Sequence, residues 1–466
     1  MLKQAVDYYH ELLENADIAA DSFRILHDGL ERNKLIFGGR PLSPYLRPHF
    51  VTEHDWSRVI AICETIWSAL QKVKDAAVGD DALLGELGVT EIERELVKID
   101  PGYKQVSPTA RLDSFLTDDA YSFVELNGES PAGIAYADSA SEIFLQMPVM
   151  QRFAERYSVT RFHGRPKMLK VLLDCYTEFL GRKPGENPVI AIVDLEDLPT
   201  HKEFELFREY FEAQGYTSII CTPAQLEFDG ERLYFGSLAI DIVYKRLLVN
   251  EYLPIIGEHT ALLDAYRAGA ICMVNSFRGK LVHKKAIFAV LTNERYEHLF
   301  SPEELDAIRQ HVPWTRRFRE ERTLVRTVSS TESAVPSIDR SIEQVDLVEW
   351  TRANASNLVL KPNDDYGGHG IFIGWNSSEE EWNAAISEAL KDGDYLVQER
   401  VRTAKEMFPM IFDDFGKWGM IEQLVDLDPL LFNGQVGSAF TRLSSSELAN
   451  VSSGGGMVPT FVIGEK

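Results

Sequence analysis

The chain has 466 residues and carries 48 basic against 72 acidic side chains, which gives a formal net charge of −24 at pH 7. A chain of this length can form two or three domains with separate cores. Its 45% hydrophobic and 26% charged residues are typical of a soluble globular protein, and its acidic balance argues against nucleic acid or an anionic membrane as the main partner.

The spacing of the cysteines and the composition of the N-terminal residues both favour the cytoplasm as the cellular compartment. The four cysteines show no CxxC spacing, which favours reduced thiols over disulfides or a zinc site. The first residues, MLKQAVDYYHELLENAD, lack the apolar centre of a signal peptide, and no stretch of the chain approaches the ~18 apolar residues of a membrane helix. We therefore expect a cytoplasmic protein with no membrane partner.

The N-terminal region is predicted to be helical. Apolar residues at helical spacing predict one or two amphipathic helices within 1–35 and a long helix over about 53–76. Trp56, Ile60 and Trp67 share one face of the long helix, and we interpret this face as core or interface, not as a cofactor site.

A dense polar motif follows in Ala110–Gly133, ARLDSFLTDDAYSFVELNGESPAG, which predicts a strand, a turn, a second strand and a loop. Alternation along the second strand places Phe123, Glu125 and Asn127 on one side. Asp113 lies on the first strand. Two carboxylates and an amide oxygen suit Mg²⁺, although an exposed polar face with an Asn-Gly turn would look the same.

The middle of the chain changes from helices to an α/β pattern. Residues 142–179 are helical in pattern, and RKPGENP at 182–188 has the composition of a linker. Strands at 189–193, 217–221 and 240–244, with a helix at 202–214, then predict a small parallel sheet. No glycine fingerprint accompanies it, so we do not expect dinucleotide binding. Arg246 closes the last strand at the end where α/β proteins bind ligands, and it is either a substrate-carboxylate contact or a surface arginine.

The next segments contain one helix with a basic start. VHKKAIFAVL at 282–291 predicts a single helix whose first turn carries His283, Lys284 and Lys285. A further helix is expected at 301–311. Residues 316–345 are predicted to be a loop-rich connection.

A glycine-rich hairpin is predicted at Leu358–Gly374, LVLKPNDDYGGHGIFIG. Its backbone N–H groups can close over phosphates, with Lys361 on the first strand. The loop matches neither the P-loop nor the dinucleotide fingerprint, and His369 within it is expected to face solvent. A helix at 377–390 and the strand YLVQERV at 395–401 follow, and from Met407 the chain is predicted to alternate short strands and turns.

Together these motifs resemble the ATP-grasp superfamily in an altered order. A lysine strand, a glycine loop, a Gln-Glu strand, an arginine strand and an Asn…Gly-Gly segment follow one another as in unpermuted members, at Lys361, Gly367–Gly370, Gln398-Glu399, Arg442, and Asn450 with Gly454–Gly456. The Glu-x-Asn strand that ends those members stands here at Glu125–Asn127. RLDSFL…FVELNGESP resembles the glutathionylspermidine synthetases, and the resemblance covers the chain from about residue 40.

The resemblance implies an α/β (α+β) architecture, a circularly permuted ATP-grasp fold with a small Rossmann-like pre-ATP-grasp domain and an N-terminal helical region. The expected parts are a helical region at 1–105, a permuted metal-binding part at 106–180, a pre-ATP-grasp-like domain at 186–280 and a nucleotide-binding domain at 281–466.

The resemblance also implies an activity, ATP-dependent joining of a carboxylate to an amine through an acyl phosphate, with ATP and Mg²⁺ as cofactors. The substrates would be small-molecule or peptide acids and amines. No amidase-like part precedes the strand pair, so we expect the synthetase activity alone. The alternatives are a non-catalytic ATP-binding scaffold and an ATP-grasp phosphotransferase.

The site residues that the resemblance implies fall into four groups. ATP would contact Lys285 (or Lys284), Lys361, Gly367, Gly368, Gly370, Gln398, Glu399 and Val401. Asp113, Glu125 and Asn127 would hold the metal, and Arg111 and Arg442 would stabilise the acyl phosphate. Arg246 and Asn450 would contact the substrate.

Overall fold

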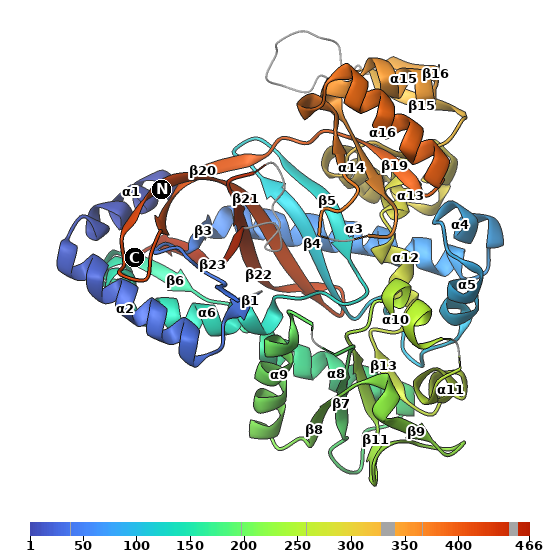
Figure 1. Cartoon of the computed structure of the whole chain (residues 1–466), viewed down its shortest axis with the longest axis horizontal. Coiled ribbons are helices and arrows are strands. Elements are labelled where there is room, and N and C mark those ends of the chain that lie inside the picture. Colours follow the sequence, from blue (N-terminus) through green and yellow to red (C-terminus); the bar gives the residue numbers. More distant parts are fainter. Residues whose placement is uncertain (38, 197, 258, 328–340, 366, 447–454) are drawn as a thin grey trace.

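A large, mainly antiparallel sheet lies at the centre of the fold, and segments from both ends of the chain build it (Figure 1). The computed structural model describes residues 1–37, 39–196, 198–257, 259–327, 341–365, 367–446 and 455–466. The strand order is β3-β23-β22-β21-β4-β5, with β20 pairing with β21 and β6 pairing with β23. The bounds are β3 (His49–Thr52), β4 (Thr109–Leu116), β5 (Tyr121–Asn127), β6 (Tyr157–Thr160), β20 (Ala404–Ile411), β21 (Trp418–Phe432), β22 (Gln435–Ser444) and β23 (Gly456–Glu465).

The polar strand pair β4–β5 joins the sheet that the C-terminal strands form. Leu430 of β21 pairs antiparallel with Arg111 of β4, so strands about three hundred residues apart in sequence are hydrogen-bonded neighbours. The prediction of only short strands after Met407 is wrong, because β21 runs for 15 residues. This length lets β21 pair with β20, β22 and β4.

A β-bulge corrects the predicted faces of β5. Asp113 pairs with Glu125 while Ser114 pairs with Phe123, so β5 carries one extra residue, Val124, between them. Phe123 therefore packs in the buried core with Leu112 and Leu126, and the prediction that Phe123 shares a face with Glu125 is wrong. The alternation fails because an unpaired residue reverses the side on which the following side chains lie.

Helices cover both faces of the large sheet. Phe461 of β23 packs in the core formed with α1, α2, α6 and α7, whereas the next residue, Val462, packs in the core formed with α3. The α3 helix matches its prediction and is capped at its N-terminus by Thr52, whose hydroxyl accepts a hydrogen bond from Asp55 N. The bounds are α1 (Leu2–Leu13), α2 (Ala16–Arg32), β1 (Ile36–Phe37), β2 (Arg40–Pro41), α3 (Glu53–Ala77), α4 (Asp81–Glu86), α5 (Glu91–Lys98), α6 (Ile134–Gln146), α7 (Pro148–Arg156) and α8 (Gly164–Leu180). Among the described residues, no helix combines the length and apolarity that a membrane span requires.

The predicted small parallel sheet is confirmed. Its order is β13-β12-β7-β8, and all three pairings are parallel. A second, antiparallel sheet of order β11-β10-β9 lies beside it in the lower part of Figure 1. The bounds are β7 (Ile190–Val193), α9 (His201–Ala213), β8 (Ser218–Cys221), β9 (Leu226–Phe228), β10 (Leu233–Phe235), β11 (Leu238–Ile240), β12 (Ile242–Lys245), α10 (Val249–Ile256), α11 (Ala261–Arg267) and β13 (Cys272–Val274).

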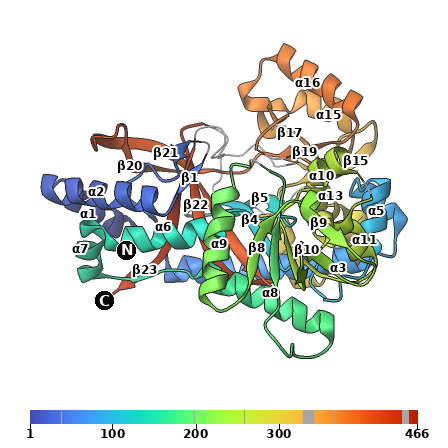
Figure 2. The same cartoon turned by 60° about the horizontal axis from the view of Figure 1, so that its bottom comes forward.

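The glycine hairpin belongs to a separate four-stranded sheet of order β14-β19-β17-β18, which stands with α15 and α16 above the rest of the molecule in Figure 2. The predicted hairpin is confirmed, because Val359 pairs antiparallel with Ile373. The loop-rich prediction for 316–345 is wrong in part, because β15 and β16 pair antiparallel there. The bounds are α14 (Pro302–His311), β14 (Thr315–Arg317), β15 (Arg322–Thr327), β16 (Ser341–Asp346), α15 (Leu347–Ala353), β17 (Leu358–Pro362), β18 (Phe372–Ile373), α16 (Glu379–Asp392) and β19 (Tyr395–Glu399).

The predicted single helix over 282–291 is wrong, because it is two short helices, α12 (Lys280–His283) and α13 (Ala286–Leu291). Lys284 leaves the helical conformation with ψ 128°. Lys285 N then donates to Asn363 O at 2.9 Å instead of continuing the helix. The break therefore exists because the chain hydrogen-bonds to the segment after β17.

Candidate active site

One face of the large sheet gathers the polar residues of the strand pair. Arg111 lies opposite Asn127, and Asp113 lies opposite Glu125, in the β4–β5 register. Directly opposed residues of antiparallel strands project to the same face. Arg442 of β22 reaches the same place, since its guanidinium hydrogen-bonds to Asp113. The structure thus brings these five predicted residues together.

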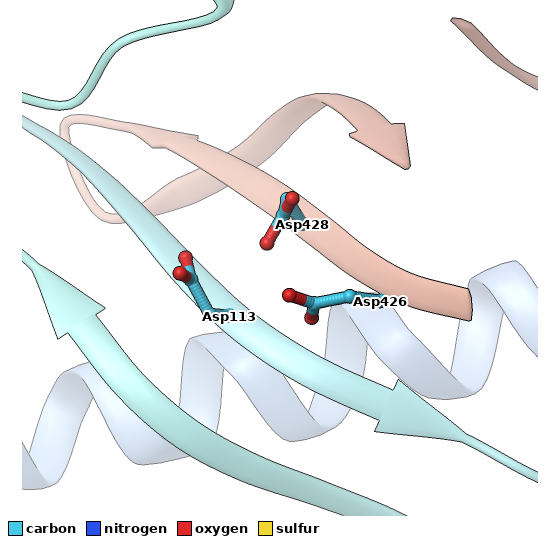
Figure 3. Close-up of side chains that lie close together, drawn as sticks. All are labelled: Asp113, Asp426 and Asp428. Atoms are coloured by element: carbon cyan, nitrogen blue, oxygen red, sulfur yellow. The ribbon is translucent and has the colours of Figure 1, made fainter. Parts of the chain in front are cut away.

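Two aspartates that we did not predict complete this cluster. Asp113 of β4 and Asp426 and Asp428 of β21 point toward one another in Figure 3, and their nearest oxygens all lie within 4.8 Å of one another. All three side chains are buried. The signal was present in the sequence as Val-Asp-Leu-Asp, since two acids at alternate positions of an apolar strand share one face.

Arg442 lies among the three carboxylates. Its Nη2 hydrogen-bonds to Asp113, and to Asp426 Oδ2 at 2.5 Å, while its Nε donates to Asp428 Oδ2 at 3.0 Å. Arg111 forms a two-pronged contact with Asp113, with Nε at 2.7 Å from Oδ1 and Nη2 at 3.0 Å from Oδ2. Two arginines thus compensate three buried acids.

Burial and these contacts shift the pKa values of the three aspartates in different directions. Burial alone would raise the pKa of Asp113, but Arg111 and Arg442 hold it well below its usual range. Burial raises the pKa of Asp426 to about 7 against the opposing effect of Arg442. Burial also raises the pKa of Asp428 well above its usual range. Asp113 is therefore the fixed negative charge of the group.

Two lysines face the edge strand β5 from the side of the glycine hairpin. Lys361 Nζ donates to Val124 O at 3.3 Å and to Gln398 Oε1 at 2.8 Å. Lys285 Nζ lies 3.2 Å from Glu125 Oε1. Lys284, the other lysine considered for this position, lies instead 2.9 Å from Asp364 Oδ2. Of the two neighbouring lysines, Lys285 therefore faces the metal-binding candidate.

The environment of Lys361 weakens its hold on its proton. Burial lowers the pKa of Lys361 to about 8, Glu125 opposes this decrease and Lys285 reinforces it. An anion arriving near the two ammonium groups would reverse the effect. This place is therefore suited to a negatively charged group such as a phosphate.

The glycine loop has the backbone conformation that its sequence predicts. Gly367, Gly368 and Gly370 have φ of 70°, 79° and 65°, a left-handed region that favours glycine. His369 lies within this loop. The loop is thus free of side chains at three positions close to Lys361 in sequence.

The Gln-Glu strand contacts the site through Gln398. Gln398 is buried, and its side chain accepts from Lys361 and donates to Thr315 Oγ1 at 3.1 Å. Glu399 N donates to Trp314 O at 2.9 Å, and Val401 follows the strand. Gln398 thus supports the lysine, and the adenine contacts of all three residues stay predictions.

Arg246 is held inside the protein. Its Nη1 donates to Pro131 O at 2.6 Å and to Tyr244 Oη at 3.1 Å, and its Nη2 lies 3.6 Å from Glu203 Oε2. A cavity of about 440 Å³ at the ends of β7 and β8 includes Asp194 and Phe204 in its lining. The substrate contact of Arg246 stays a prediction, and Asn450 lies outside the described residues.

The potential metal ligands around Asp113 are carboxylate oxygens, the atoms that a hard divalent cation prefers. Asp113 itself is engaged by Arg111 and Arg442, and Asn127 Nδ2 donates to Asp113 Oδ1 at 3.1 Å. Glu125 is the more accessible carboxylate, with 23% of its side chain exposed. A metal ion bound to Asp113 would therefore replace one of the hydrogen bonds that this carboxylate accepts. The ion would also keep the negative charge of Asp113 compensated.

Comparison with known proteins identifies structural relatives. No family model matches the chain, and no curated protein matches it in sequence. The apo structure of a glutathione synthetase-like effector from Globodera pallida is similar over 96% of this chain and 97% of that chain, with a TM-score of 0.60 and 13% identity. The two proteins thus share a mixed α/β fold over nearly their whole lengths.

Two further structures are only distantly similar. A protein assigned as a gamma-glutamylcysteine synthetase from Methylobacillus flagellatus KT has 10% identity and a TM-score of 0.38, over 86% of each chain. The D-alanyl-alanine synthetase A of Vibrio cholerae has 12% identity and a TM-score of 0.25, over 51% of this chain and 67% of that chain. These two values are too low to support an argument about this protein.

Proposed function

We propose that this protein is an ATP-dependent carboxylate–amine ligase with a circularly permuted ATP-grasp architecture. The observation that carries the proposal is the meeting of Lys361 and Lys285, from the glycine-hairpin side, with Glu125 and Asp113 on the large sheet. Binding of MgATP requires cationic side chains that neutralise the phosphates and carboxylates that hold the Mg²⁺ ion. The likeness in fold to a protein described as glutathione synthetase-like supports it.

Each group would have a defined task in such a reaction. Lys361 and Lys285 would bind the transferred phosphoryl group, whose chemistry depends on positioning and charge neutralisation. Asp113, Glu125 and Asn127 would hold Mg²⁺, which supplies positive charge to the phosphates. Gln398, Glu399 and Val401 would contact the adenine, and Gly367, Gly368 and Gly370 would cover the phosphates.

The two arginines would stabilise the acyl phosphate that forms from the substrate carboxylate. Arg442 Nε and Nη2 are held by buried aspartates, which fixes the plane of its guanidinium. Arg111 is fixed in the same way by Asp113. Arg246 and Asn450 remain our candidates for the substrate, a small-molecule or peptide acid or amine, and we place the enzyme in the cytoplasm.

An ADP-release screen with candidate acids, each with and without amines, tests this function. We expect ADP release that requires an acid and increases with an amine. Release that ignores the amine would favour a phosphotransferase. Absence of turnover over a broad panel, with MgATP bound, would favour a non-catalytic ATP-binding protein.

We expect Lys361→Ala to weaken MgATP binding at least about tenfold, or about 1.4 kcal/mol. The reason is that Lys361 places the positive charge of the glycine hairpin beside β5, where we propose that it binds the phosphates of ATP. Isothermal titration calorimetry measures the effect. Lys391→Ala, an exposed lysine at the end of α16 in the same part of the molecule, is the control and should bind normally. Equal affinities of the two variants would remove Lys361 from the site.

We expect MgATP affinity to fall as the pH rises through about 8, because Lys361 loses its charge there. The sign follows from the pKa of Lys361, which lies below its usual 10.5, so the lysine is charged below about pH 8 and neutral above it. The limiting slope is about tenfold per pH unit for one proton. Calorimetry between about pH 7 and 9.5 measures it, and Lys361→Ala should remove the dependence.

A further inference from the structure

Asp364, three residues after Lys361, lies in a buried group of charged side chains. Its Oδ1 lies 2.7 Å from Lys280 Nζ and its Oδ2 lies 2.9 Å from Lys284 Nζ. Its side chain is 12% exposed, while those of the two lysines are 1% and 2% exposed. Because burying a charge is costly unless it is paired, Asp364 stabilises both lysines by supplying a counter-charge that they share.

Each of the two lysines also contacts a second carboxylate. Lys280 Nζ lies 3.1 Å from Glu129 Oε2, and Lys284 Nζ lies 3.1 Å from Glu93 Oε2. We call Glu93, Glu129, Lys280, Lys284 and Asp364 the buried charge network. The side chains of Glu129 and Glu93 are 0% and 4% exposed, so the charges of the network compensate one another inside the protein.

The network joins the nucleotide side to the metal side of the site. Glu129 follows Asn127 by two residues, and Asp364 follows Lys361 by three. The backbones approach closely here, since a Cβ on Gly279 would lie 2.6 Å from Gly128 O, and a Cβ on Gly128 would lie 2.4 Å from Val282 Cγ2 of α12. Substitution of Gly128 would therefore push α12 away from β5.

Hydrogen bonds join the residues on either side of Asp364 to Lys285 and Ala286. Lys285 N donates to Asn363 O at 2.9 Å, and Ala286 N donates to Asn363 Oδ1 at 2.8 Å. The Nζ of Lys285 lies 2.5 Å from Asp365 O. The segment 363–365 thus holds the break between α12 and α13, and with it Lys285, while Lys361 lies two residues before this segment on β17.

We propose that Asp364 is a positioning residue, which fixes Lys285 and Lys361 against the edge of β5 by anchoring segment 363–365 to Lys280 and Lys284. The proposal rests on the proposed function insofar as the two lysines bind phosphate. Asp364 itself touches neither nucleotide nor metal in this scheme. Its loss would leave the adenine contacts in place and misplace the cations.

The test compares Asp364→Asn with Glu304→Gln in the full-length protein. Glu304 is a matched control, a buried carboxylate 2.6 Å from Lys72 Nζ, on α14. We expect Asp364→Asn to weaken MgATP binding at least tenfold in calorimetry and to change adenosine binding less than twofold. Glu304→Gln should change neither. A general loss of structure would instead weaken both ligands together.

A second measurement needs no nucleotide. Hydrogen exchange of the Lys285 and Ala286 amides should accelerate at least tenfold in Asp364→Asn, because both amides donate to Asn363. The double variant Asp364→Asn/Lys284→Gln removes one charge of each sign, so the network keeps the net charge that it has in the wild-type protein, and this variant is used if the single variant unfolds. It should show the same acceleration.

Unchanged exchange in a folded Asp364 variant would overturn the proposal, as would an equal loss of MgATP and adenosine affinity. Failure of the wild-type protein to bind MgATP would refute the proposed function instead. In that case the exchange measurement still decides whether Asp364 positions the two lysines.

Discussion

Arg442→Ala is expected to lower the free energy of unfolding by about 3–5 kcal/mol at pH 7, because it takes a buried cation from Asp113 and from the partly ionised Asp426 and leaves Asp428 without this hydrogen-bond donor. Arg442 hydrogen-bonds to Asp113, Asp426 and Asp428, whose oxygens lie within 4.8 Å of one another. Urea unfolding at several pH values measures the loss.

The same variant should show a characteristic pH dependence. Without Arg442 the aspartates would bind protons more tightly in the folded than in the unfolded protein, so the variant should be least impaired near pH 5 and most impaired near pH 7. Arg402→Ala is the control, since its side chain is 65% exposed and pairs with the exposed Asp119. It should cost at most about 1 kcal/mol. A similarly small loss for Arg442→Ala would show that the cluster does not need its cation.

Glu125→Gln is expected to lower turnover at least about a thousandfold, or about 4 kcal/mol of transition-state stabilisation. The substitution removes the more accessible carboxylate of the proposed Mg²⁺ site and the partner of Lys285, which lies 3.2 Å away. Its side chain is 23% exposed, and Lys285 keeps its hydrogen bond to Asp365 O, so the thermal unfolding midpoint should change little. The measurement is ADP release with the acid and amine that the screen identifies.

Asp119→Asn is the matched control for this loss of one carboxylate. Asp119 lies in the turn of the same strand pair and contacts Arg402 near the surface. We expect it to keep wild-type turnover. Should Glu125→Gln also turn over normally, Glu125 is not a ligand of the catalytic metal, and the site would have to use Asp426 and Asp428 instead.

Local patterns determined much of this protein in advance. Period-two alternation and turn residues predicted the β4–β5 pair, and three glycines predicted the loop after Lys361, which has the left-handed backbone that glycine favours. These features depend on neighbours in sequence. The helix α3 and the small parallel sheet were predictable for the same reason.

The composition of the acidic cluster depended on partners across the sheet. Asp426 and Asp428 became site residues only because β21 lies between β4 and β22, which brings Asp113 and Arg442 to them. The alternation of Val-Asp-Leu-Asp was visible, but it could not show which strand would lie beside it. Pairing of distant strands is set by burial and register over the whole sheet.

What the sequence by itself determined is therefore the local chemistry: a lysine before a glycine hairpin, and carboxylates on a strand pair. Only the tertiary structure decided that Lys285 and not Lys284 faces Glu125, that a bulge at Val124 turns Phe123 into the core, and that Arg246 is enclosed. Each outcome depends on burial and on hydrogen bonds between segments that lie far apart in the chain. These contacts override local periodicity because an unpaired buried charge or amide costs more than a broken helix turn.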